Sequence, residues 1–93
     1  MAPEAAGYGA DVAYSSNDLY SRENRLEDRI RDGGNTGALS RYDAANDLRT
    51  LHRIRRYQDE RAGESGYLSH DARADVSGRL ETLDSTVSAQ WRE

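Results

Sequence analysis

Histidine and carboxylate side chains are where catalytic chemistry would be sought first in this chain, and the chain has few suitable sets of them. His70 and Asp71 could act together in proton transfer, but adjacent residues of a helix diverge by about 100° and cannot readily work on one substrate. His52 has no histidine, cysteine or suitably spaced carboxylate partner for a metal site, and the chain contains no cysteine. We therefore expect no catalytic residue, no metal ligand, no bound cofactor and no enzymatic activity.

A basic stripe is the second group that could do chemistry, because all 13 basic side chains are arginine and several fall close together. The stripe consists of Arg49, Arg53 and Arg56 on one side of a helix, flanked by His52 and Arg55. Such a stripe could bind phosphate or another polyanion. The net charge of −4 and the pI near 5.1 disfavour nucleic acid, so we expect these arginines to pair with Glu23, Glu27 and Asp28 or to stay solvated. Anion or nucleic-acid binding through the stripe remains an alternative function.

The elements that must position these residues have little apolar material to build from. The large aliphatic residues are eight Leu, three Val and two Ile, beside one Trp and no Phe. Burying them at roughly 1.5 to 3 kcal/mol each supplies only some tens of kcal/mol, against an ordering cost near 1.5 kcal/mol for every fixed residue. Because a lone copy would have a narrow margin of stability, we expect a homo-oligomer or a complex with another protein.

The first 17 residues differ from the rest of the chain, since they are rich in Ala, Gly, Tyr, Ser and Asn without a helical period. We expect a flexible N-terminal arm over residues 1–17 and a single all-α domain over residues 18–93. No apolar run is long enough to span a membrane, and we identify no signal peptide. The first nine residues are similar to the mature start of an exported protein, so we expect a periplasmic or exported bacterial protein, with the cytoplasm as the alternative.

Apolar spacing predicts three helices in the domain, and they cover residues 18–32, 40–62 and 69–91. Gly33 and Gly34 are expected to end the first helix, because glycine tolerates the left-handed conformation of a helix end. The second helix repeats apolar residues every three positions, so its stripe should wind around the helix and touch neighbours on several sides. These residues are Tyr42, Ala45, Leu48, Leu51, Ile54 and Tyr57. The helices should fold up-down-up, or open out and be completed by a second copy.

A four-residue motif precedes both the second and the third helix: Gly37-Ala38-Leu39-Ser40 recurs as Gly66-Tyr67-Leu68-Ser69. Each copy is predicted to start a helix, with Gly in a turn conformation, Leu over the end of the core and Ser capping the first turn. The motif resembles that of small, Arg-rich helical proteins exported by proteobacteria, in which helical hairpins repeat this signal. The resemblance spans about residues 30–90 and concerns architecture, without an activity attached to it.

The segment from Asp32 to Asp43 also resembles an EF-hand calcium loop, with twelve residues, Gly37 in sixth place and an acid at each end. Besides the terminal carboxylates, only the neutral hydroxyls of Thr36 and Ser40 match ligand positions. Two carboxylates are too few for a tight site. Weak calcium or ion sensing by this loop is therefore an alternative function.

The leading hypothesis is a non-enzymatic structural or protein-interaction module that self-associates. The surface expected to associate is apolar surface left over on the second and third helices, formed by Leu51, Ile54, Tyr57, Val87 and Trp91. Gly78 lies off the apolar face of the third helix. It is either tolerated surface variation or a place where another backbone approaches.

Overall fold

The structure is a computed structural model that describes residues 3–92, with side chains described from residue 18 onward. This part of the chain contains helices and no strand. The elements are α1 (Pro3–Thr36), α2 (Arg41–Ala62), the short 3-10 helix η1 (Gly63–Ser65) and α3 (His70–Gln90). The predicted all-α fold with three helices is confirmed. The arm predicted over residues 1–17 falls on residues whose side chains lie outside the described part.

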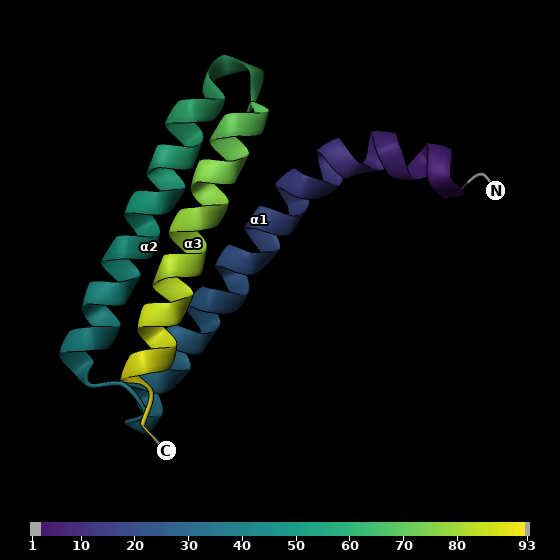
Figure 1. The fold of residues 1–93 in the computed structure, drawn as a ribbon. Coiled ribbons are helices and arrows are strands. Elements are labelled where there is room, and N and C mark those ends of the chain that lie inside the picture. The colour runs from purple at the N-terminus through teal and green to yellow at the C-terminus, as the bar shows by residue number, and fades with distance from the viewer. Residues whose placement is uncertain (1–2, 93) are drawn as a thin grey trace.

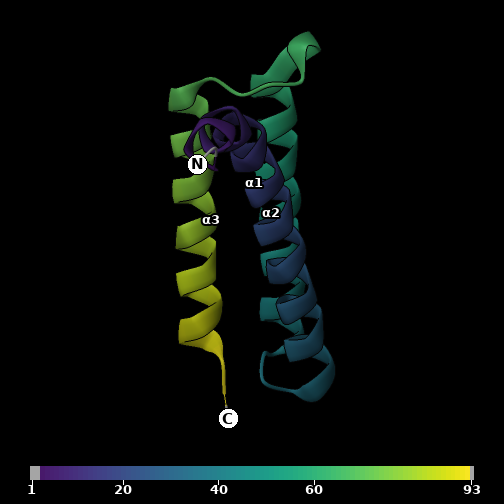
Figure 2. The same ribbon diagram turned by 90° about the vertical axis from the view of Figure 1, so that its right-hand side faces the viewer.

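The three helices form an up-down-up bundle in which each helix contacts the other two. Figure 1 shows α2 and α3 side by side and antiparallel, with the C-terminal part of α1 running along them. Figure 2 shows the same arrangement from the side, with α1 lying close to α2 and α3 alongside both. The core therefore closes within one chain.

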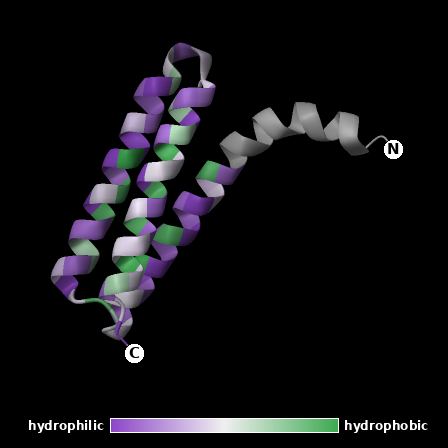
Figure 3. Cartoon of the chain, viewed as in Figure 1, coloured by the Kyte–Doolittle hydropathy of each residue, from purple (hydrophilic) through white to green (hydrophobic). Residues whose placement is uncertain are grey.

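The core uses almost all the large aliphatic residues that the described part of the chain offers. Eleven of the twelve Leu, Ile and Val residues between positions 18 and 92 are buried, and the twelfth, Leu48, packs half-buried against them. Hydrophilic positions (purple) predominate along the described helices, and hydrophobic positions (green) are scattered among them (Figure 3). So polar a chain can enclose a core because it buries nearly all of its few large aliphatic side chains.

The first helix differs from its prediction at both ends, because α1 begins at Pro3 instead of residue 18 and continues past residue 32 to Thr36. Leu19, Leu26 and Ile30 are buried as expected, but Gly33 and Gly34 do not end the helix. A buried Gly33 continues the core face one turn beyond Ile30, and α1 runs on to Thr36. The left-handed residue is Gly37, with φ of +87°, which is the glycine of the repeated motif.

The second helix buries one face, so the predicted winding stripe is wrong. Tyr42, the first residue of that stripe, is 74% exposed, and Ala45 is exposed as well. The buried positions of α2 are Ala44, Asp47, Leu51, Ile54 and Gln58. Two of these five are polar, so the spacing of apolar residues alone predicts a different set.

The repeated motif starts both helices in the predicted manner, beginning with its serines. The Ser40 hydroxyl accepts a hydrogen bond from the Asp43 amide at 3.0 Å, and the Ser69 hydroxyl accepts one from the Ala72 amide at 3.1 Å. Both serines have extended backbone conformations and occupy the N-cap positions of α2 and α3. Each therefore satisfies one of the free amides of a first helical turn.

The glycines and leucines of the motif also behave as predicted. Gly37 and Gly66 have φ angles of +87° and +77°, a region that residues with a side chain rarely adopt. Leu39 and Leu68 are buried at opposite ends of α2 and belong to the core. The motif therefore turns the chain, covers one end of the core and caps the next helix within four residues.

The lower end of the bundle in Figure 1 is closed by the C-terminal residues. The Arg92 amide donates a hydrogen bond of 2.8 Å to the Ala38 carbonyl, which fastens the end of α3 to the turn between α1 and α2. Trp91 packs half-buried against the core beside Leu39 and Gly33. Trp91 and Arg92 are thus part of the packed structure.

Candidate functional site

The five residues expected to form an association surface belong to the core of a single chain. Leu51 and Val87 have no exposed surface and Ile54 is 5% exposed. Tyr57 and Trp91 are half-buried and pack against the same core. The prediction that they are leftover apolar surface is therefore wrong, because three helices in contact cover these side chains within one copy.

Tyr57 lies at the centre of a polar cluster that joins α2 to α3. Its hydroxyl donates a hydrogen bond to Oδ2 of Asp75 and accepts one of 2.7 Å from Arg61. Arg79 donates to Oδ1 of Asp75 at 3.0 Å and stacks with its guanidinium 4.0 Å from the centroid of the Tyr57 ring. The Tyr57 hydrogen bond, and then Arg79, lower the pKa of Asp75. Asp75 is thus ionised and holds Tyr57 and Arg79 in place. It is not suited to act as a general base, because a general base needs a pKa near neutrality.

Glu23 is a carboxylate buried completely in the core between α1 and α2. Neither of its oxygens accepts a hydrogen bond from any described residue, and Nε of Arg55 lies 3.6 Å from Oε1. Burial raises the pKa of Glu23 to about 7, although the charge of Arg55 acts in the opposite direction. The same Arg55 pairs with Glu27 at 2.9 Å. An ionised Glu23 is therefore poorly compensated near neutral pH.

Asp47 and Gln58 are two further polar side chains buried on the inner face of α2. Oδ2 of Asp47 and Oε1 of Gln58 find no hydrogen-bond donor among the described residues. Burial, and next the charge of Asp43, raise the pKa of Asp47, while a hydrogen bond with Gln90 lowers it. Glu23, Asp47 and Gln58 thus interrupt the core with polar groups that the spacing of apolar residues could not reveal.

An open groove runs between α2 and α3. One wall is a line of small residues of α3 at intervals of four, Ala74, Gly78, Thr82 and Thr86. A Cβ atom built on Gly78 would meet no atom within 4 Å, so the space beside this glycine is open. The interval of four was visible in the sequence, but only the structure shows that this line faces a groove.

The α2–α3 groove carries charges of both signs. Asp47 and Arg53 line it from α2, and Asp75 and Arg79 line it from α3. Arg79 and Asp75 are paired with each other. The two acids and two bases leave the lining without net charge, and Ile54 and Leu83 contribute its apolar part.

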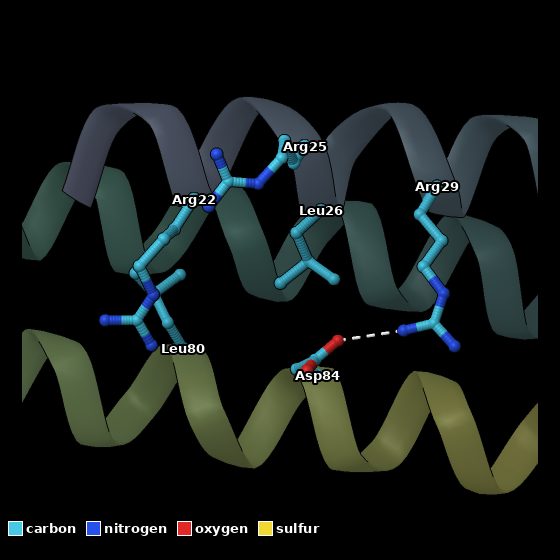
Figure 4. A pocket seen from close by; sticks show the side chains of 6 residues that line it. All are labelled: Arg22, Arg25, Leu26, Arg29, Leu80 and Asp84. Atoms are coloured by element: carbon cyan, nitrogen blue, oxygen red, sulfur yellow. Dashed lines mark hydrogen bonds and ion pairs between the residues drawn. The ribbon is translucent and has the colours of Figure 1, made fainter. Parts of the chain in front are cut away.

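A second pocket lies between α1 and α3, and Figure 4 shows it from close by. Its lining consists of Arg22, Arg25, Leu26, Arg29, Leu80 and Asp84. The three arginines project from one side of α1, and Leu26 points between them towards α3. The intervals of three and four between the arginines place them on one helix face, and this spacing is a signal of the cluster that the sequence already contains.

Two of the three arginines of this pocket are held by α3. Arg22 donates a hydrogen bond of 2.8 Å to the Ser77 hydroxyl. Arg29 donates to Asp84 at 2.8 Å and to Ser88 at 3.1 Å. Arg25 makes neither an ion pair nor a side-chain hydrogen bond with another described residue. The α1–α3 pocket therefore contains one neutralised and two uncompensated guanidinium groups.

The basic stripe predicted on α2 lies on the surface, and the expected pairing with α1 is made by a residue that flanks it. Arg55 pairs with Glu23 and Glu27 of α1. Arg49, Arg53 and Arg56 are exposed, and within the described residues none of them forms an ion pair. Both histidines, His52 and His70, are also exposed.

The EF-hand-like segment is divided between a helix and a turn. Asp32 to Thr36 continue α1, so the open loop begins only at Gly37. Asp43 lies in the first turn of α2, where its amide donates to the Ser40 cap. Among residues with described side chains, no three or more His, Cys, Asp or Glu are grouped so that they could hold a metal ion.

The helices of the described chain are also too short or too polar to cross a membrane. Known proteins offer no further guide to the site. The chain matches no protein-family model, no curated protein and no solved structure.

Proposed function

We propose that this chain is a non-enzymatic protein-interaction module that self-associates through the α2–α3 groove. The observation that carries the proposal is the line of small residues along one wall of the groove, with open space beside Gly78. Small side chains let a second helix approach closely, towards the short end of the usual 8 to 10 Å between helix axes, roughly. The α2–α3 groove is proposed in place of the surface formed by Leu51, Ile54, Tyr57, Val87 and Trp91, because these five side chains pack in the core of a single chain.

A second copy of the same chain is the occupant that the charges favour. Two Asp and two Arg side chains line the groove, so the same face of another copy meets it without net repulsion. The α1–α3 pocket, in contrast, has an excess of positive charge and would repel itself. Self-association through the α2–α3 groove also fits the small core, since each copy gains stability from the other.

We include the absence of a catalytic role in this proposal, because the ionisable groups with shifted pKa values are either paired or buried. Asp75 is held ionised by Tyr57 and Arg79, and Glu23 is enclosed in the core, where a substrate has no access. The α2–α3 groove and the α1–α3 pocket are both open to solvent, whereas catalysis gains from a site that excludes water. We extend the proposal to a periplasmic or exported bacterial protein, on the resemblance of its repeated helix-entry motif to that of small Arg-rich exported proteins.

Mass in solution tests the proposed self-association. We expect the full chain to show a concentration-dependent mass above 10.4 kDa in sedimentation equilibrium. A Thr82→Arg variant should be monomeric, because the long side chain fills the middle of the groove. The control is Ala45→Arg, which adds the same side chain to an exposed position of α2 away from the groove. A monomeric full chain at about 100 µM, or equal effects of both variants, would contradict the proposal.

A further inference from the structure

We infer that the α1–α3 pocket is a binding site for an organic phosphate monoester. This site lies on a different face from the α2–α3 groove and does not depend on self-association. The inference rests on three features of the pocket: the number of guanidinium groups, the way in which they are held, and the apolar floor between them.

The charge of the pocket favours a dianion. Arg22 and Arg25 form no ion pair within the described residues, while the charge of Arg29 is balanced by Asp84 at 2.8 Å. Asp18, one turn before Arg22, is exposed and leaves that arginine unpaired in the structure. Two guanidinium groups without an ion-pair partner make this pocket locally positive, although the net charge of the protein is −4.

The positions of the guanidinium groups favour a phosphate group over a diffuse polyanion. Hydrogen bonds to Ser77 and to Asp84 and Ser88 hold Arg22 and Arg29 against α3. Less side-chain entropy is then lost when an anion binds between them. The planar guanidinium fork matches phosphate oxygens in pairs, which is the reason that arginine is preferred in phosphate sites. Arg25, which is exposed and free to turn, can complete the set.

The floor of the pocket favours an organic ligand over inorganic phosphate. Leu26 of α1 and Leu80 of α3 line the pocket between the arginines (Figure 4). These two leucines are only 6% and 2% exposed, so an apolar substituent on the phosphate packs over the edge of the core and removes mainly its own apolar surface from water. It also excludes water from the ion pairs, which strengthens them.

Titration of the isotope-labelled chain with phenyl phosphate tests the inference, with amide chemical shifts as the readout. We expect saturable shifts at residues of α1 and α3 around the pocket, with weaker binding as salt is added. Inorganic phosphate should bind more weakly because it lacks the apolar group, and benzoate should bind more weakly because it carries a single charge. An Arg25→Gln variant should lose about fivefold or more in affinity, since one charged hydrogen-bond donor is removed.

The matched control is Arg56→Gln, which removes an exposed and unpaired arginine from α2, away from the pocket. It should leave the affinity for phenyl phosphate unchanged. Equal losses in the two variants would show that only the overall charge matters and would overturn the site. Absence of saturable shifts at about 10 mM phenyl phosphate, or equal affinity for benzoate, would also overturn it. Thermal unfolding of both variants confirms that the compared proteins are folded.

Discussion

Gly33 and Trp91 are in such close contact that a Cβ atom built on Gly33 would lie 2.8 Å from Cζ3 of the indole ring. The same atom would lie 2.7 Å from Cγ of Leu39. Real Cβ atoms essentially never come so close to their neighbours. One glycine in α1 therefore lets the turn after α1 and the end of α3 pack together.

Replacement of Gly33 by alanine should destabilise the protein, although alanine is the better helix former. We expect Gly33→Ala to lower the free energy of unfolding by about 1 to 3 kcal/mol, because Leu39 and Trp91 must move apart. Urea unfolding of the variant and the parent protein measures the difference.

Gly78→Ala is the matched control, since Gly78 is also helical and its added methyl group meets no atom within 4 Å. It should raise the stability of a single copy by up to ~1 kcal/mol through helix propensity alone. A stabilising effect of Gly33→Ala would show that the contact with Trp91 is loose in solution.

The buried carboxylate of Glu23 predicts that stability falls as the pH rises towards neutrality. Its pKa is raised in the folded protein from an ordinary value near 4.5 to about 7. The folded chain therefore holds this proton where the unfolded chain has lost it. The contribution of Glu23 is complete below pH 4.5 and is lost as the pH passes through about 7. At about 1.4 kcal/mol per pKa unit, the loss is on the order of 3 kcal/mol.

A Glu23→Gln variant should remove this dependence, and it should be more stable than the parent protein at pH 8, roughly by the lost contribution. Urea unfolding between pH 4 and pH 8, about the range of the raised pKa, measures both curves. Glu27→Gln is the control, because hydrogen bonds from Arg31 and then Arg55 lower the pKa of Glu27. Its contribution is present above the ordinary pKa and is lost as the pH falls. Parallel curves for the parent protein and Glu23→Gln would refute the assignment.

The two capping serines should contribute similar and independent amounts to stability. Ser40→Ala and Ser69→Ala each remove the oxygen that accepts an amide hydrogen bond at the start of a helix. Each change should cost about 1 kcal/mol in thermal or urea unfolding. The caps lie at opposite ends of α2, so the double variant should lose the sum of the two.

Ser→Gly at the same positions provides the comparison, since glycine is tolerated at this position and should cost only a few tenths of a kcal/mol, about the usual value. A loss well below the sum in the double variant would mean that the two helix starts are coupled through the core.

Local chemistry in the sequence was enough to predict three helices and the starts of the last two. Ser40 and Ser69 cap first turns, and Gly37 and Gly66 turn the chain, because these roles depend on a residue and its immediate neighbours. The apolar residues Leu19, Leu26 and Ile30 likewise predicted the inner face of α1.

Only the tertiary structure decided which polar residues are buried and which apolar residues remain free. Glu23, Asp47 and Gln58 lie on core faces because neighbouring helices cover those positions. The burial of a polar side chain cannot be predicted from its residue type or from its immediate neighbours. Leu51 and Val87 were expected on the surface, yet α1, α2 and α3 close over them in a single copy. Helix propensity and capping depend on residues a few positions apart, whereas burial depends on how whole helices pack against one another. The α2–α3 groove and the α1–α3 pocket therefore follow from the tertiary structure and could not be predicted from the sequence.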